Sequence, residues 1–116
     1  MRKGWIAVLA GAALLSATPV QAATKKKTIR LGDNYFTPKT VSVKRGTTVT
    51  WRWPSFEEAG DVHDVKLRSG PKGVKKFQSE AASTDYSFKR KLTVAGTYKL
   101  VCTLHHEMTM TLRVKR

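Results

Sequence analysis

The feature that most constrains the fold of this chain is the alternation of apolar and polar residues in short segments. Val49, Trp51 and Trp53, for example, are separated by Thr50 and Arg52. Such a period of two is typical of a β-strand with one buried face, and turn residues separate the segments. The strands predicted in this way are residues 28–31, 40–44, 48–53, 64–67, 86–89, 97–102 and 111–115. The pattern predicts an all-β fold, a sandwich or barrel.

The N-terminal residues have the layout of a secretory signal peptide. Arg2 and Lys3 form a positive start, an apolar run follows over residues 4–17, and Val20-Gln21-Ala22 provides small residues at a cleavage site. A membrane anchor is the alternative, but a run of about 14 residues is shorter than the roughly 20 that span a bilayer. We therefore expect residues 1–22 to be removed and the protein to be exported, to a periplasm or to the cell exterior.

The exported part is one small and strongly basic domain. We expect residues 23–27 to be a basic flexible start and residues 28–116 to form the folded domain, since this length suits a single core. Loss of Arg2 and Lys3 leaves 20 basic against 8 acidic residues, a net charge of +12. Such a charge attracts acidic proteins, anionic membranes and cell-wall polymers. Export and the lack of a base-reading motif argue against nucleic acid, and we expect a monomer.

The single cysteine, Cys102, needs an explanation in an exported protein. It could be an inert core residue, half of an intermolecular disulfide or a metal ligand. Its neighbours favour the last interpretation. His105 and Met108 follow it in a segment between two predicted strands, and His63 shares the inward parity of a third strand.

These four side chains suit copper. Thiolate and thioether are soft ligands, imidazole serves both oxidation states, and two His and one Cys with a weak Met form the blue-copper arrangement. Zinc seldom uses Met. Catalysis by a nucleophilic cysteine would need a base and a substrate cleft, which nothing in the sequence indicates.

The segment Cys102-Thr103-Leu104-His105-x-x-Met108 resembles the copper loop of the cupredoxins, and its short spacing is most similar to that of amicyanin and bacterial plastocyanin-like proteins. Similar segments recur at residues 36–38, 43–51, 63–65 and 96–102. The resemblance implies a Greek-key β-sandwich or barrel of the cupredoxin type, with one copper ion held by His63, Cys102, His105 and Met108. It also implies an electron port at the exposed edge of His105.

Three residues depart from the family pattern. Met110 is a second candidate axial ligand, but it occupies a glycine position of the short-loop pattern, so we expect it to pack in the core. His106 replaces a common proline, and we expect its ring to face solvent. Asp64 replaces a common asparagine; its carboxylate could accept a hydrogen bond from Thr103, and its charge would favour Cu(II).

The predicted function is one-electron transfer through Cu(II)/Cu(I) cycling to an acidic redox partner, not enzymatic catalysis. One alternative is a copper carrier or scavenger that uses the same ligands. Another is a metal-free module for surface interactions. A copper enzyme is disfavoured, because additional copper sites would be needed and His106 is the one histidine left over.

Overall fold

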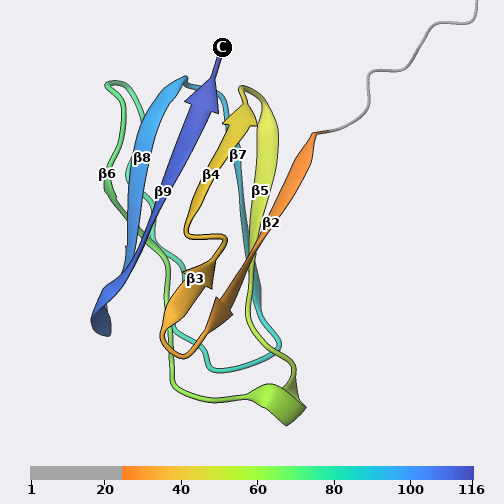
Figure 1. Ribbon diagram of the computed structural model, residues 1–116. Helices are drawn as coiled ribbons and strands as arrows, with labels where there is room; N and C mark the ends of the chain where they lie inside the picture. The colour runs from red at the N-terminus through yellow and green to blue at the C-terminus, as the bar shows by residue number, and fades with distance from the viewer. Residues whose placement is uncertain (1–24) are drawn as a thin grey trace, which may run out of the picture.

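The alternating segments pair into two four-stranded sheets in the computed structural model, which describes residues 25–116 (Figure 1). The predicted signal peptide and its cleavage site lie outside the described residues. In residues 25–116, no helix has the length and apolarity needed to cross a membrane.

The first sheet has the order β3-β2-β5-β7. Its strands are β2 (Lys26–Gly32), β3 (Tyr35–Thr37), β5 (Thr47–Arg52) and β7 (Ser87–Leu92). Strands β2 and β5 are parallel, whereas β2 with β3 and β5 with β7 are antiparallel. This mixture arises because the chain passes repeatedly between the two sheets.

The second sheet has the order β4-β9-β8-β6. Its strands are β4 (Thr40–Lys44), β6 (Lys66–Ser69), β8 (Gly96–Cys102) and β9 (His105–Lys115). Strands β8 and β9 form an antiparallel hairpin, while β4 pairs parallel with β9. A 3-10 turn, η1 (Phe56–Glu58), lies in the connection between β5 and β6.

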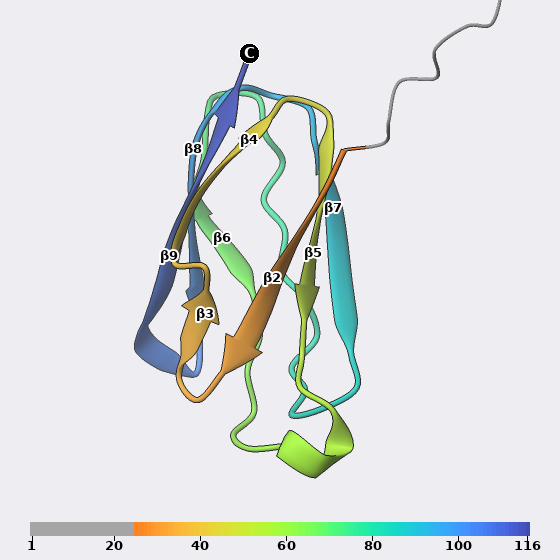
Figure 2. The ribbon, with the colours of Figure 1, turned by 45° about the vertical axis from the view of Figure 1, so that its right-hand side comes forward.

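The core lies between the two sheets, which form separate layers in Figure 2. Trp51, Trp53 and Phe88 are buried there, as the alternation predicts. Trp51 is fully buried, and its Nε1 donates a hydrogen bond to the sulfur of Met110 across the sandwich at 3.5 Å. A wide indole at this position fixes the separation of the layers, because protein cores are close-packed.

Two strands begin two or more residues earlier than the sequence predicts. Strand β2 starts at Lys26, because Lys26 and Lys27 pair with Thr48 and Val49 of β5, whereas we expected both lysines in the basic flexible start. Strand β9 starts at His105 and not at Thr111. Main-chain pairing determines both starts, and it does not depend on the apolar pattern.

The loops that carry the candidate ligands gather at one end of the sandwich. The β2–β3 turn, η1 and the β8–β9 turn lie at the bottom in Figure 1, and the C-terminus leaves at the top.

A tight turn at Arg45-Gly46 connects the two sheets. It is held by hydrogen bonds from the two amides to Lys115 and Leu92, and Gly46 has a φ of 93°, which favours glycine.

Candidate metal centre

His63, Cys102 and His105 converge at this end of the sandwich. One ligand atom from each side chain lies within 4.8 Å of the others. Cys102 ends β8, His105 begins β9, and the two residues are directly paired across the two-residue turn Thr103-Leu104. His63 comes from the connection that enters β6. The hairpin and the connection thus bring together residues 39 positions apart in the sequence.

His63 is fixed by main-chain and indole hydrogen bonds. It exchanges both backbone hydrogen bonds with Ala82, at 2.9 and 3.0 Å. The Nε1 of Trp53 donates to the carbonyls of His63 and Ala82, at 3.1 and 2.8 Å. The His63 side chain is 1% exposed. A buried imidazole on a backbone held in this way has little freedom to move when a metal binds.

Asp33 holds the outer nitrogen of this imidazole. Its Oδ1 lies 2.8 Å from His63 Nε2, and its carboxylate also accepts hydrogen bonds from the Asp61 amide. The hydrogen bond with His63, helped by that from Asp61, holds the pKa of Asp33 below its usual value. A carboxylate only accepts, so the proton of neutral His63 is on Nε2 and the lone pair is on Nδ1. That Nδ1 lies 4.0 Å from the Cys102 sulfur.

His105 has the same arrangement with a different acceptor. Its Nε2 lies 3.2 Å from the carbonyl oxygen of Val62. A carbonyl also only accepts, so Nδ1 carries the free lone pair here as well. The rings of His63 and His105 have centroids 5.0 Å apart. Both imidazoles can therefore offer Nδ1 to a single ion, with their Nε2 atoms anchored by the protein.

Asp64 braces the turn between the two candidate ligands of the hairpin. Its carboxylate accepts hydrogen bonds from the Thr103 amide at 2.7 Å, the Thr103 hydroxyl at 2.6 Å and Gln78 Nε2 at 3.0 Å. The expected bond from the Thr103 hydroxyl is thus confirmed. The backbone amide of Asp64 also points at the fully buried Cys102 sulfur, at 3.5 Å.

The carboxyl group of Asp64 is ionised in this setting. Burial disfavours its charge, but the hydrogen bonds from Thr103 and Gln78 outweigh burial and hold the pKa of Asp64 below its usual value. The buried carboxylate places a negative charge beside Cys102. Such a charge stabilises a cation held by the thiolate.

The two methionines occupy inward positions of β9. Met108 is fully buried three residues after His105. Met110 is also buried, and its sulfur accepts the hydrogen bond from Trp51, which agrees with the predicted packing role. His106 is exposed, as expected.

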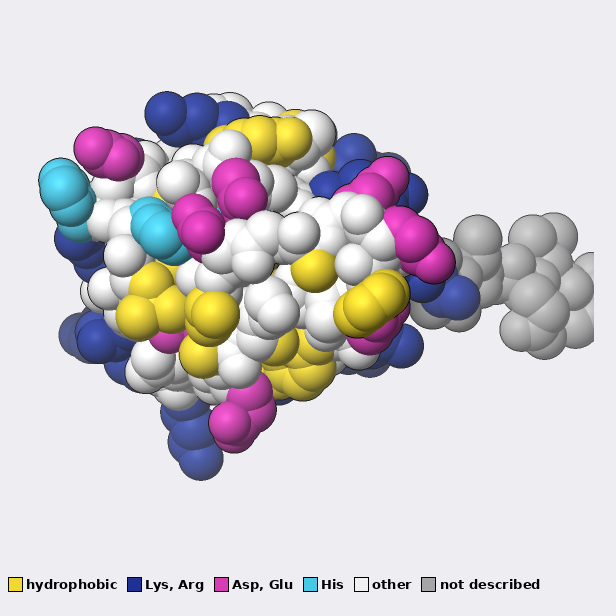
Figure 3. Space-filling model, turned by 90° about the horizontal axis from the view of Figure 1, so that it is seen from below, with side chains coloured by type: hydrophobic (Ala, Val, Ile, Leu, Met, Phe, Trp, Pro, Cys, Tyr) yellow, Lys and Arg dark blue, Asp and Glu magenta, His cyan; other side chains and the backbone are white. Residues whose placement is uncertain are grey.

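Charge is distributed unevenly around this end of the molecule. Figure 3 views it from below and shows acidic side chains spread over this face, some of them beside the histidines, with the cationic groups mostly at the rim. Seven of the eight acidic residues lie in the connections between strands, and Glu107 lies near the start of β9. Exposed Leu104 and Val62 flank His105 and add an apolar component to this face.

The sequence did not reveal Asp33, Val62 or Gln78 as parts of the site. Asp33 reads as an ordinary turn residue beside Gly32, and its partner His63 is 30 positions away. Val62 contributes a backbone carbonyl, which carries no residue-type signal. The one clue in the sequence was that Val62 precedes His63, which places the Val62 backbone at the end of the sandwich that carries the candidate ligands.

The donor set fits copper. A thiolate and two neutral imidazoles are suited to copper, and the ordered hydrogen bonds at both Nε2 atoms orient the imidazoles toward one point. A family model of copper-binding proteins, the plastocyanin/azurin family, matches residues 23–115. No curated protein matches the chain.

Solved structures with the same fold include several copper proteins. Amicyanin from Paracoccus versutus is 24% identical, with a TM-score of 0.64 over 85% of this chain and 88% of its own. A pseudoazurin from Sinorhizobium meliltoi is 18% identical, with a TM-score of 0.62 over 80% and 76%. These likenesses confirm the predicted cupredoxin β-sandwich.

A larger protein contains the same fold as one part. The copper-containing nitrite reductase from Thermus scotoductus SA-01 is 24% identical and has a TM-score of 0.65 over 89% of this chain. The chain spans 26% of the length of that reductase. This likeness shows the fold alone.

Proposed function

The chain belongs to the plastocyanin/azurin family of copper-binding proteins, and from this membership we propose that it is an exported one-electron carrier with a single type 1 copper site. Its cofactor is copper. The observation that carries the proposal is the convergence of one thiol and two imidazoles within 4.8 Å at one end of a packed β-sandwich.

The proposed ligands are His63, Cys102, His105 and Met108. Both imidazoles have Nε2 occupied by a protein acceptor, so each binds through Nδ1. Met108 is proposed as the weak axial ligand because Met110 already has a partner in Trp51. The burial of Met108 and its position three residues after His105 support this assignment.

Copper bound in this way supplies the one-electron couple Cu(II)/Cu(I). The chain contributes a scaffold that holds the donor atoms in nearly the same positions in both states. Asp33 and Val62 restrain the two imidazoles, and Asp64 restrains the turn between Cys102 and His105. Such restraints reduce rearrangement during electron transfer, and the Asp64 carboxylate favours the more highly charged state.

His105 is the proposed electron port at the copper end. Its ring is partly exposed, and the exposed side chains of Leu104 and Val62 lie beside it. A small apolar patch of this kind suits brief contact with another redox protein. The basic charge of the whole chain favours an acidic partner and predicts rates that fall with added salt.

The test begins with the visible and EPR spectra of the purified protein after addition of Cu(II). We expect an intense blue absorption that disappears on reduction and returns on reoxidation. Cys102→Ser should abolish the absorption, Met108→Ala should alter it, and Met110→Ala should leave it unchanged. Binding of Cu(I) alone, with rapid loss to a chelator, would instead support a copper carrier and contradict electron transfer.

A further inference from the structure

A basic hollow lies on the outer face of the second sheet, directly beside Cys102. It is bordered by Lys66, Arg68, Lys76 and His106, and its volume is about 260 Å³. We propose that an acidic one-electron redox protein docks at this basic hollow, as a second place of electron exchange separate from the apolar patch at His105. The inference rests on the proposed function, because it assumes that the chain exchanges electrons with such a partner.

The hollow belongs to a broadly cationic sheet face. In strands β4, β6 and β8 the outward positions carry no acidic residue, and in β9 Glu107 is the one acid. The outward basic residues of this sheet are Lys44, Lys66, Arg68, Lys99, Arg113 and Lys115. Arg68 borders both the basic hollow and a second hollow that Lys99 also lines. A partner seated there meets positive charge over several strands.

Backbone pairing and a lysine contact hold the basic hollow in shape. Lys66 pairs with Val101 in the β6–β8 ladder, and it also forms a bridge with Gln78. The Nζ of Lys76 donates to the carbonyl of Arg68 at 3.3 Å, which ties the 72–78 segment to β6. The backbone of the basic hollow and the Lys76 side chain are therefore positioned before a partner arrives, which reduces the ordering cost of docking.

The copper end is the less favourable surface for an acidic partner. Asp33 contacts His63 and the Asp61 amide, and Asp61 precedes Val62, whose carbonyl lies beside His105. The turn η1, with Glu57 and Glu58, lies at the same end (Figure 1). Like charges placed opposite one another across an interface oppose association. The net positive charge therefore attracts an acidic protein to the molecule. The acidic groups at the copper end direct that protein away from this end, toward the outer face of the second sheet.

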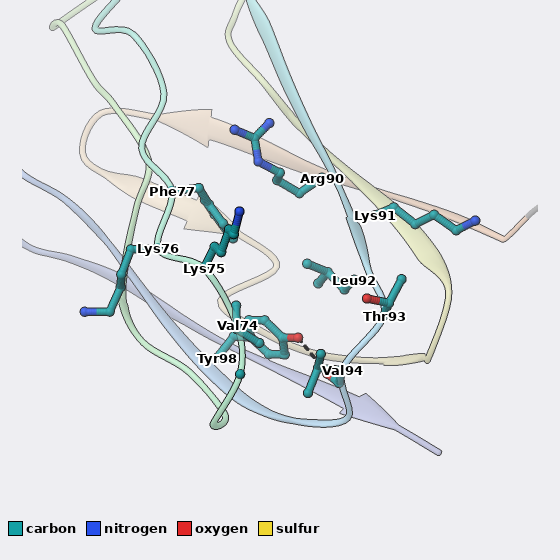
Figure 4. Close-up of a pocket in the computed structure, with 11 residues that line it drawn as sticks. Val74, Lys75, Lys76, Phe77, Arg90, Lys91, Leu92, Thr93, Val94 and Tyr98 are labelled. Atoms are coloured by element: carbon teal, nitrogen blue, oxygen red, sulfur yellow. Dashed lines mark hydrogen bonds between the residues drawn. The ribbon is translucent and has the colours of Figure 1, made fainter.

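Another basic hollow opens along the edge between β7 and the 73–77 segment (Figure 4). None of the candidate copper ligands lines it. Its Arg90 guanidinium lies over the Phe88 ring at 4.3 Å, so that charge already has an aromatic partner. In Figure 4, Lys76 points away from Lys91, toward the other side of the segment. The hollow along β7 therefore lacks a route to the metal.

Cys102 gives the basic hollow its route to the metal. Cys102 and Thr103 form part of its wall, and the Cys102 sulfur is buried behind them. A copper ion held by Cys102 would supply one electron as Cu(I) becomes Cu(II), and the Cys102 thiolate and backbone would provide the path to the oxidised centre of the docked protein, which would be reduced. In the reverse direction, a reduced partner would return one electron to the copper site. No covalent bond forms or breaks, and no proton is transferred.

Binding is tested with a glutamate decamer titrated into the reduced, copper-loaded protein at low salt. Amide NMR shifts should concentrate at Lys66, Arg68, Val101, Thr103 and His106. Lys66→Glu/Arg68→Glu should weaken binding at least tenfold, because two attractions become repulsions. The matched control is Lys89→Glu/Lys91→Glu on the outer face of the first sheet, which changes the net charge equally and should weaken binding less than threefold.

Electron transfer is tested by stopped-flow oxidation of the same proteins with hexacyanoferrate(III), an anionic oxidant. The rate constant should fall about tenfold in Lys66→Glu/Arg68→Glu and recover in part in Lys66→Gln/Arg68→Gln. Equal losses in the control pair, or NMR shifts centred on Leu104 and His105, would overturn the docking site. Reversible copper reduction in every variant would then leave the electron-carrier proposal intact, whereas its absence in the wild type would contradict that proposal itself.

Discussion

Replacing Asp64 by alanine tests the hydrogen bonds that brace the Cys102–His105 turn. Three hydrogen bonds end on this carboxylate, two from Thr103 and one from Gln78. A hydrogen bond to a charged group contributes about 1.5–3 kcal/mol. Thr103 and Gln78 are exposed, so their donors can turn to water once the carboxylate is gone. We therefore expect Asp64→Ala to lower the free energy of unfolding by about 2–3 kcal/mol in total.

The loss should depend on pH in one direction. The folded pKa of Asp64 lies below its usual value of 3.8, so the ionised group stabilises the fold at pH values above 3.8. This stabilisation is lost as the pH falls through the folded pKa. The difference between wild type and Asp64→Ala should therefore be full at pH 7 and smaller in strong acid. Asp64→Asn keeps one acceptor oxygen and should lose about 1 kcal/mol.

The assay is urea unfolding of the metal-free protein, followed by tryptophan fluorescence at neutral and acidic pH. Glu107→Ala is the control, because this exposed residue should change stability by less than about 0.5 kcal/mol. A loss in Asp64→Ala no larger than that of the control, or a loss of the same size at both pH values, would refute the bracing role.

Three further substitutions probe other parts of the structure. Asp33→Ala should weaken copper binding about tenfold in a chelator competition, because His63 Nε2 loses its carboxylate; unchanged affinity would contradict this role. Tyr98→Phe should cost about 1 kcal/mol in urea unfolding, since its hydroxyl donates to the Val94 carbonyl at 2.6 Å, and no change would mean that water replaces the bond. Gly46→Ala should cost about 1–2 kcal/mol, because φ there is 93°; a more stable variant would show that the turn tolerates a side chain.

The fold was predictable because its signals are local. Alternation at Val49, Trp51 and Trp53 identifies an inward face from neighbouring residues alone, and burial follows that pattern. The start of β9 was not predictable in this way. His105 belongs to the strand because it pairs with Cys102 of β8, and main-chain pairing leaves no mark on residue type.

The candidate ligand residues could be predicted from the sequence, but most of the residues that hydrogen-bond to them could not. The residue types of Cys102, His105 and Met108 identify them as possible metal ligands, and strand parity adds His63. The role of Asp64 could be inferred from the sequence because Asp64 is the neighbour of His63. Asp33 reaches the site through tertiary structure, from a turn whose sequence predicts only a turn. Long-range contacts by ordinary residues are the part that sequence patterns omit.

The direction of β9 has a practical consequence for attaching the protein to other objects. The strand runs from His105 at the copper end to Lys115 beside the C-terminus. Thr109 and Lys115 are six residue steps apart, about 20 Å at about 3.4 Å per step, and the irregular segment from Thr109 to His105 leads on to the copper end. A purification tag, fluorophore or electrode linker fused after Arg116 therefore sits at the far pole from His105. Immobilised by that linker, the molecule presents its histidine-bearing end to the solution.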